Sequence, residues 1–212
     1  MNSSRPPASS PVERSRQSPA ENRSAHTLVL GGIRSGKSGW AERLAATRAE
    51  PVRYLATGPD RPDDPDWVAR VRTHRERRPP GWETAEVGAS PDMLPAALRS
   101  ADPGTVLLVD DVGSWLVGAF DAAAAWELPD PWAAITDDVD ALTAALAACR
   151  AEAVLVSPEV GWTVVPATRS GRVFVDAQGT LNQRLAALCA RVVLVVAGRA
   201  LRLSDAPDSL LS

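Results

Sequence analysis

The stretch Gly31-Gly32-Ile33-Arg34-Ser35-Gly36-Lys37-Ser38 decides the fold of this 212-residue chain. It reads Gly-x4-Gly-Lys-Ser, follows the apolar run 27–30 and precedes the amphipathic run 40–48. A strand, a glycine-rich turn and a helix in this order present backbone N–H groups and the positive end of a helix dipole to one anion. We therefore predict a phosphate-binding P-loop, in which Lys37 reaches the β/γ-phosphates of a nucleotide and Ser38 binds Mg²⁺.

Composition limits the possible partners of the chain. The net charge is −3, with 45% hydrophobic and 23% charged residues, so no basic surface is expected for nucleic acid or for an anionic membrane. No apolar run reaches the length of a membrane span, and we expect a cytoplasmic protein. Cys149 and Cys189 lie in apolar patterns without metal-type spacing, which predicts buried reduced thiols.

The chain divides into one domain between two tails. Residues 1–25 are rich in Ser, Pro, Arg and Glu and have too few apolar side chains to offset the entropy of ordering, so we predict a disordered tail. We predict one P-loop domain over residues 26–204 and a C-terminal tail over residues 205–212.

Apolar runs alternate with amphipathic runs along the domain. Strands are expected at 27–30, 52–57, 82–86, 105–111, 153–157, 191–197 and 201–203. Helices are expected at 40–48, from 66 to before 79, and at 90–100, 115–126, 131–150 and 179–190, with Asp130 capping the fifth of them. This alternation predicts an α/β fold of the P-loop NTPase type: a mostly parallel sheet with helices on both faces.

Several charged residues fall where this fold places its ligands. Asp110 follows a continuous apolar run, which is typical of a buried strand that brings a Mg²⁺-binding carboxylate beside a P-loop. We therefore predict that Asp110 binds Mg²⁺. Asp66, Arg70 and His74 share one stripe of the helix that begins at 66. Glu159 lies in a connection over 158–171, and connections of that length are usually functional. For the helical stripe, Asp110 and Glu159, the alternative is that they are solvated charges without a ligand.

Three groups of motifs, in order over residues 27–203, resemble the bifunctional adenosylcobinamide kinase / adenosylcobinamide-phosphate guanylyltransferase family. The first is the P-loop, followed by Tyr54-x-Ala56-Thr57. The second is Arg70-Val71-x-x-His74-x-x-x-Arg78-Pro79-x-x-Trp82-x-Thr84-x-Glu86. The third comprises Val156-Ser157-x-Glu159-Val160-Gly161 and Asp176-x-x-Gly179-x-Leu181-Asn182-Gln183.

The resemblance implies two activities. A nucleoside triphosphate, GTP or ATP, would phosphorylate the aminopropanol hydroxyl of adenosylcobinamide, with Lys37, Ser38 and Mg²⁺ at the phosphates. GMP would then pass from GTP to the product through a phosphoramidate on His74, the histidine that matches the family motif. The resemblance also implies Glu86 and Asp110 at the nucleotide, Arg70, Arg78, Trp82 and Glu159 at the substrate, and a homotrimer.

The chain departs from the family pattern at positions where the family tends to have polar or charged side chains. These are Gly113, Gly118, Pro158, Ala167 and Val175. Two alternatives therefore stay open: a monofunctional P-loop kinase of cobinamide or another alcohol in which His74 is idle, and a P-loop regulatory protein that is not an enzyme.

Overall fold

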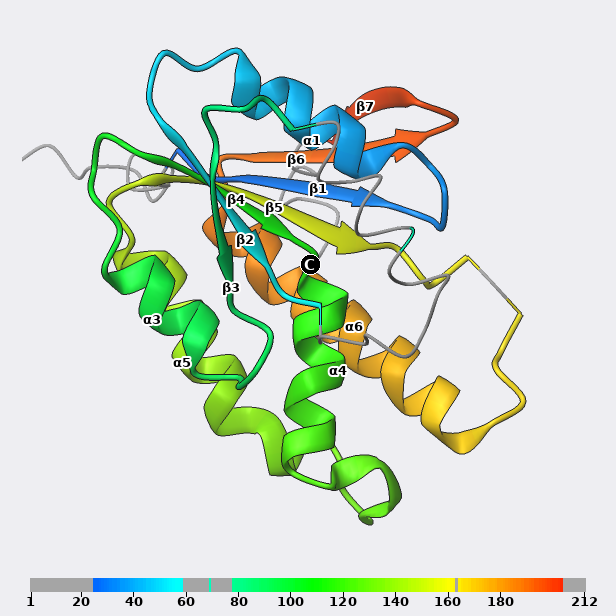
Figure 1. Ribbon diagram of the computed structural model, residues 1–212. Helices are drawn as coiled ribbons and strands as arrows, with labels where there is room; N and C mark the ends of the chain where they lie inside the picture. Colours follow the sequence, from blue (N-terminus) through cyan, green and yellow to red (C-terminus); the bar gives the residue numbers. More distant parts are fainter. Residues whose placement is uncertain (1–24, 59–68, 70–77, 163, 204–212) are drawn as a thin grey trace, which may run out of the picture.

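The computed structural model describes residues 25–58, 69, 78–162 and 164–203, which form a seven-stranded sheet with helices against it (Figure 1). The strands are β1 (Thr27–Gly31), β2 (Val52–Ala56), β3 (Glu83–Glu86), β4 (Val106–Asp110), β5 (Glu152–Pro158), β6 (Arg191–Val196) and β7 (Arg199–Leu203). The helices are α1 (Lys37–Ala46), α3 (Met93–Arg99), α4 (Val112–Ala122), α5 (Thr136–Ala148) and α6 (Arg169–Leu188). Single 3₁₀ turns, η2 (Ala125–Glu127) and η3 (Ala133–Ile135), separate α4 from α5.

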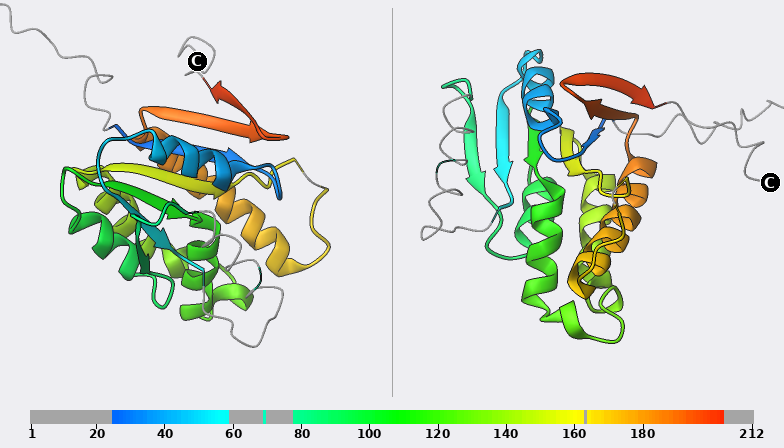
Figure 2. Two further views of the ribbon diagram at one scale, coloured as in Figure 1. Left: turned by 45° about the horizontal axis from the view of Figure 1, so that its top comes forward. Right: turned by 90° about the vertical axis from the view of Figure 1, so that its right-hand side faces the viewer.

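The strand order is β3-β2-β4-β5-β1-β6-β7, and every pair is parallel except β6–β7. β6 and β7 form a hairpin, joined by Ala197 and Gly198 at φ 50° and 74°, which are the left-handed angles of a tight two-residue turn. Figure 2 shows this hairpin at one edge of the sheet. The predicted mostly parallel P-loop sheet is confirmed, including the edge strand at its C-terminal end.

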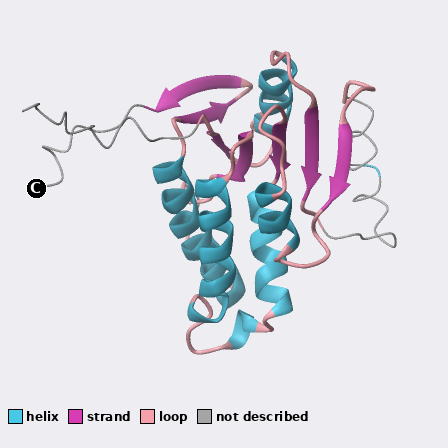
Figure 3. Cartoon of the chain, turned by 90° about the vertical axis from the view of Figure 1, so that its left-hand side faces the viewer, coloured by secondary structure: helices cyan, strands magenta, loops and turns pink. Residues whose placement is uncertain are grey.

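Alternate residues of the strands feed two separate cores. Leu28, Leu55 and Leu107 pack with α3, α4, α5 and α6, whereas Val29, Tyr54 and Leu108 pack with α1 on the opposite face. Figure 3 shows the four helices α3–α6 as a layer on one side of the sheet. Because both faces are covered, the central strands are apolar at nearly every position, as the sequence shows.

The described helices do not begin at the predicted residues: α1 begins at Lys37, not 40, and α3 at Met93, not 90, and the three later helices also start elsewhere. α4 begins at Val112, not 115, because Asp111 caps it and accepts a hydrogen bond from the Ser114 N–H at 2.7 Å. α5 begins at Thr136, not 131, and the Asp130 carboxylate instead accepts from the Ala133 N–H at the 3₁₀ turn. α6 begins at Arg169, ten residues before the predicted start at 179, because Thr168 caps it and its two glycines do not interrupt it.

The amino-terminal edge of the sheet is held by buried polar contacts. His26 accepts a hydrogen bond from the Ala153 N–H at 3.2 Å through Nδ1 and lies 3.0 Å from the Leu146 carbonyl through Nε2, so the imidazole joins β5 to the end of α5.

Cys149 and Cys189 are buried free thiols, as predicted. Among the described helices, none is both long and apolar enough to cross a bilayer. The two predicted tails lie outside the described residues, apart from Ala25.

Candidate functional site

The glycine-rich turn after β1 has the shape that binds phosphate. A Cβ added at Gly31 would lie 2.4 Å from Ser35 Oγ and 2.7 Å from the Val195 carbonyl oxygen, so only glycine fits there. Gly36 has φ 91° and occupies the cap position of α1, where it offers no side chain to the first N–H groups of the helix. Those N–H groups and the positive end of the helix are consequently left to a ligand.

The sequence-predicted residues of the turn lie together. Lys37 and Ser38 are the first two residues of α1, while the side chains of Ile33 and Arg34 are exposed on the outside of the turn. Arg34 adopts a left-handed φ of 56°, which helps reverse the chain between β1 and α1. The Ser35 N–H donates to the Gly32 carbonyl at 3.2 Å and closes the turn.

Asp110 is brought next to Ser38, as predicted. The Ser38 hydroxyl donates to Asp110 Oδ1 at 3.1 Å, and the Tyr54 hydroxyl donates to Oδ2 at 2.8 Å. β4 ends at Asp110 and α1 begins beside it, so the carboxylate and the hydroxyl meet at the carboxyl edge of the sheet. Open α/β sheets bind their ligands at this edge.

The electrostatics of this carboxylate reflect competing influences. Burial raises the pKa of Asp110, while the hydrogen bonds from Tyr54 and Ser38 and the charges of Lys37 and Arg78 oppose that rise. Burial also raises the pKa of the adjacent Asp111, and the charge of Asp110 raises it further. A cation near Ser38 would relieve the cost of holding these carboxylates ionised.

The oxygen atoms of Ser38 and Asp110 suit Mg²⁺. Within the described ranges no group of three or more His, Cys, Asp or Glu side chains is placed to hold a metal ion. Mg²⁺ does not need such a group of side chains, because it is commonly held by one or two protein oxygens together with water and substrate phosphates. The donor set therefore fits a nucleotide-bound magnesium ion.

The structure describes four further predicted site residues. Glu86 and Glu159 lie at this carboxyl edge, whereas Trp82 directly precedes β3 and so lies at the opposite, amino-terminal edge. Glu86 ends β3, in register with Ala56, which is in turn in register with Asp110. The Arg78 guanidinium lies 3.3 Å from the centre of the Tyr54 ring, and Trp82 is partly buried against the α1-side core. The Glu159 N–H donates to the Gly31 carbonyl at 3.0 Å, while its carboxylate accepts from Gly161. Arg70 and His74 lie outside the described residues.

A buried polar cluster behind the site was not predicted as functional. Asn182 donates to the Pro158 carbonyl at 3.0 Å, and Ser157 donates to Asn182 Oδ1 at 2.5 Å. Gln178 donates to both Ser157 and Asn182, at 2.9 and 3.0 Å. The sequence signal for this cluster is a pair of polar residues four apart, Gln178 and Asn182, because that spacing places both on one face of a helix. The cluster fixes the end of β5, directly before Glu159.

Two of the departures from the family pattern touch each other. A Cβ added at Gly113 would lie 2.6 Å from Pro158 Cγ, so the small residue at 113 makes room for the proline ring. Gly118 is different, since a Cβ there would meet no atom within 4 Å. Gly113 and Pro158 therefore form one packing contact near the carboxyl ends of β4 and β5.

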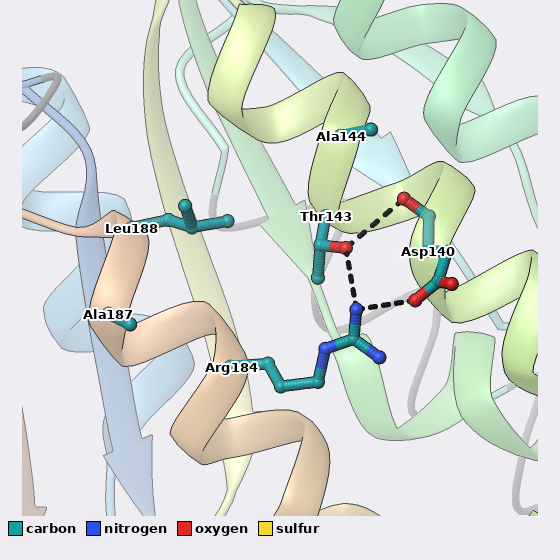
Figure 4. Close-up of a pocket in the computed structure, with 6 residues that line it drawn as sticks. All are labelled: Asp140, Thr143, Ala144, Arg184, Ala187 and Leu188. Carbon is teal, nitrogen blue, oxygen red and sulfur yellow. Dashed lines mark hydrogen bonds and ion pairs between the residues drawn. The ribbon is translucent and has the colours of Figure 1, made fainter.

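A shallow pocket of about 500 Å³ lies between α5 and α6, away from the residues predicted for the site. Its two charged side chains are paired with each other: Arg184 donates to Asp140 at 2.5 Å and to Thr143 at 3.2 Å (Figure 4). The pocket presents no group of the P-loop, and we assign it no part in nucleotide binding.

The fold and the site define a P-loop nucleotide-binding protein of the α/β class. More specifically, the chain belongs to the cobinamide kinase / cobinamide phosphate guanyltransferase family, whose model matches residues 27–203. It is 39% identical over 181 residues to the bifunctional adenosylcobalamin biosynthesis protein CobP of Pseudomonas aeruginosa, covering 85% of this chain and 98% of that protein. It is also 38% identical over 177 residues to the bifunctional adenosylcobalamin biosynthesis protein CobU of Salmonella typhimurium, covering 81% of this chain and 95% of that protein.

Solved structures support the fold alone. An ATPase of the type III secretion system of pathogenic bacteria superimposes with a TM-score of 0.53 at 12% identity, over 80% of this chain and 50% of that one. The assembled ATPase EscN from enteropathogenic E. coli gives a TM-score of 0.53 at 11% identity, over 82% and 43%. The chain thus spans half or less of these ATPases.

Proposed function

We propose that this protein is a bifunctional enzyme that phosphorylates adenosylcobinamide and then transfers GMP to the phosphorylated product. The observation that carries the kinase activity is the meeting of Lys37, Ser38 and Asp110 at the start of α1, with the Ser38 hydroxyl 3.1 Å from Asp110. Membership of the family and the two bifunctional relatives support both activities.

In the kinase step, the aminopropanol oxygen bonds to the γ-phosphorus of a nucleoside triphosphate, the bond to the β–γ bridging oxygen breaks, the nucleoside diphosphate leaves, and the hydroxyl proton passes to water. The backbone N–H groups at the start of α1 and the Lys37 ammonium hold the β- and γ-phosphates and stabilise the charge that gathers on the leaving nucleoside diphosphate. Ser38 and Asp110 would hold a Mg²⁺ ion, which would add positive charge beside the phosphates. Positioning and charge stabilisation are most of what phosphoryl transfer requires.

In the second step, an imidazole nitrogen of His74 attacks the α-phosphorus of GTP and pyrophosphate leaves, which forms a phosphoramidate. A phosphate oxygen of adenosylcobinamide phosphate then attacks the same phosphorus, releases the imidazole and gives adenosylcobinamide-GDP. Neutral imidazole is a competent nucleophile near pH 7. Arg70, Arg78, Trp82 and Glu86 belong to the same motif as His74, and we assign them, with Glu159, to the nucleotide and corrinoid sites.

Labelling with α-³²P-GTP tests this proposal. We expect the wild-type protein to take up acid-labile, base-stable label, and His74→Asn to take up none while it still phosphorylates cobinamide. Lys37→Ala should lose the kinase activity. A protein that phosphorylates cobinamide but never becomes labelled would be a monofunctional kinase, and one with neither activity would be a P-loop regulatory protein.

A cytoplasmic homotrimer, implied by the family resemblance, is also part of the proposal. The edge strand β7 carries exposed apolar side chains, Leu201 and Leu203, 61% and 40% exposed, and Val196 on β6 is 51% exposed. Exposed apolar groups at an uncovered sheet edge favour contact with another chain. Light scattering during size-exclusion chromatography measures the mass directly, and a Leu201→Lys protein should shift towards the monomer.

A further inference from the structure

Tyr54 connects two residues of the site that come from different parts of the chain. It lies on β2 on the same face of the sheet as α1, and it is 3% exposed. Its strand is paired with β4 so that Tyr54 is opposite Leu108, two residues before Asp110. The phenol is long enough to lean along the sheet and reach the carboxylate at its edge, where it donates to Oδ2 at 2.8 Å.

The two oxygens of Asp110 are thus held by different hydroxyls. Ser38 donates to Oδ1 and Tyr54 to Oδ2, so rotation of the carboxylate about its last bond would break both contacts. A hydroxyl that donates to a carboxylate makes one of the stronger hydrogen bonds in proteins. Because Tyr54 comes from β2 and not from the P-loop, it fixes the carboxylate independently of the glycine-rich turn.

The ring of Tyr54 is itself fixed. The Arg78 guanidinium stacks over it at 3.3 Å from Cζ to the ring centre, and Arg78 Nη1 donates to Thr84 Oγ1 at 3.1 Å on the neighbouring strand. Guanidinium–aromatic stacking of this kind is favourable, and more so when water is excluded. The phenol is therefore held on its face by Arg78 and at its hydroxyl by Asp110.

We propose that Tyr54 is a positioning residue for magnesium: it holds the Asp110 carboxylate in the orientation that binds the metal of the metal–nucleotide complex. This inference rests on the proposed function, in which Ser38 and Asp110 bind Mg²⁺. The Tyr54 hydroxyl donates to Asp110, the residue assigned to the metal. Its loss should therefore weaken the metal-dependent part of nucleotide binding and leave the metal-independent part unchanged.

The test uses Tyr54→Phe, which keeps the ring, its burial and the stacking with Arg78, and removes the hydroxyl alone. Affinity for a fluorescent GTP analogue is measured in EDTA and across a magnesium titration, and Mn²⁺ binding to the nucleotide complex is followed by electron paramagnetic resonance. We expect the affinity in EDTA to be unchanged and the magnesium midpoint to rise by about tenfold, the usual effect of losing one hydrogen bond to a charged group. Thr143→Val, which removes a buried hydroxyl from α5, is the matched control and should leave the midpoint unchanged.

Two results would overturn the inference about Tyr54: a magnesium midpoint equal to that of the wild type, or an equal loss of affinity with and without metal, which would mark a general distortion of the site. Asp110→Asn separates this failure from failure of the proposed function. If Asp110→Asn keeps the full metal-dependent gain in affinity, the assignment of Asp110 to magnesium is wrong, and the inference about Tyr54 is overturned with it.

Discussion

The Gly198 N–H donates to the Ser35 carbonyl across 2.8 Å, so the turn of the β6–β7 hairpin supports the P-loop from the side. The approach is close: a Cβ added at Gly36 would lie 3.2 Å from Gly198 Cα. The phosphate-binding turn lies near the start of the domain, and its shape thus depends on the hairpin at the C-terminal end of the domain.

Gly36→Ala should weaken nucleotide binding and lower stability. Alanine at the φ of 91° found at Gly36 is strained by about 1–2 kcal/mol, and its methyl group would press on Gly198. Isothermal titration with GTP and thermal unfolding measure the two effects. Gly81→Ala and Gly104→Ala are matched controls, because a Cβ at either position meets no atom within 4 Å. Equal behaviour of all three variants would contradict the tight fit at Gly36.

Lys37→Ala should reduce phosphoryl transfer by about a thousandfold or more, because a fixed charge aimed at the transferring phosphate is lost. The melting temperature should stay close to that of the wild type, since Lys37 is in the first turn of α1 and outside both cores. Single-turnover transfer from γ-labelled nucleotide checks the rate. Near-wild-type turnover in the folded variant would disprove the P-loop role of Lys37.

Asn182→Ala should destabilise the protein by about 1–3 kcal/mol, because the buried hydroxyl of Ser157 and the carbonyl of Pro158 each lose a partner. Urea unfolding gives the free energy of unfolding. The adjacent Gln183 is exposed, so Gln183→Ala is the control and should change that free energy by less than about 0.5 kcal/mol. If both variants are equally stable, the buried cluster does not hold the end of β5.

Gly113→Ala should destabilise the protein by about 1–3 kcal/mol, because the new methyl group would overlap Pro158 Cγ at 2.6 Å. Pro158→Ala removes that ring atom, so the double variant should recover part of the loss, measured as a coupling energy by urea unfolding. Gly118→Ala on the same helix has open space, and it should stabilise α4 slightly. Strict additivity of the two changes would show that Gly113 and Pro158 are independent.

His26 should make the protein less stable in mild acid. Burial lowers the pKa of His26, against the opposing effects of the Leu146 carbonyl and Glu152. The unfolded chain then binds the proton more readily, so the contribution of neutral His26 is complete above about pH 6.5 and is lost as the pH falls below that value. Asp110 and Asp111 have raised pKa values and act in the opposite direction, because their protonation in acid favours the folded state.

The contribution of His26 is isolated by comparing the wild type with His26→Gln in urea unfolding at pH 5.5 and 7.5. His26→Gln removes the titrating group and leaves the two aspartates in place. The difference in unfolding free energy between the proteins should shrink at the lower pH. A difference that is constant or grows in acid would show that the imidazole is protonated in the folded protein.

The sequence by itself determined the α/β class, the P-loop with Lys37 and Ser38, the placement of Asp110 and the family. Each of these depends on residues close together in the chain or on the period of apolar residues, and such patterns are local. The start of α6 was missed although Thr168 is a good cap, because Gly171 and Gly179 weaken the helical pattern that follows it.

Only the tertiary structure decided which distant groups meet. Tyr54 contacts Asp110, Gly198 supports Ser35, and Gly113 accommodates Pro158, over separations that no local pattern encodes. The physical reason is the strand order, in which β4 lies beside β2 and β6 beside β1 although neither pair is consecutive in the chain. Close packing then fixes each contact to within a few tenths of an ångström, and that precision comes from the assembled sheet and helices.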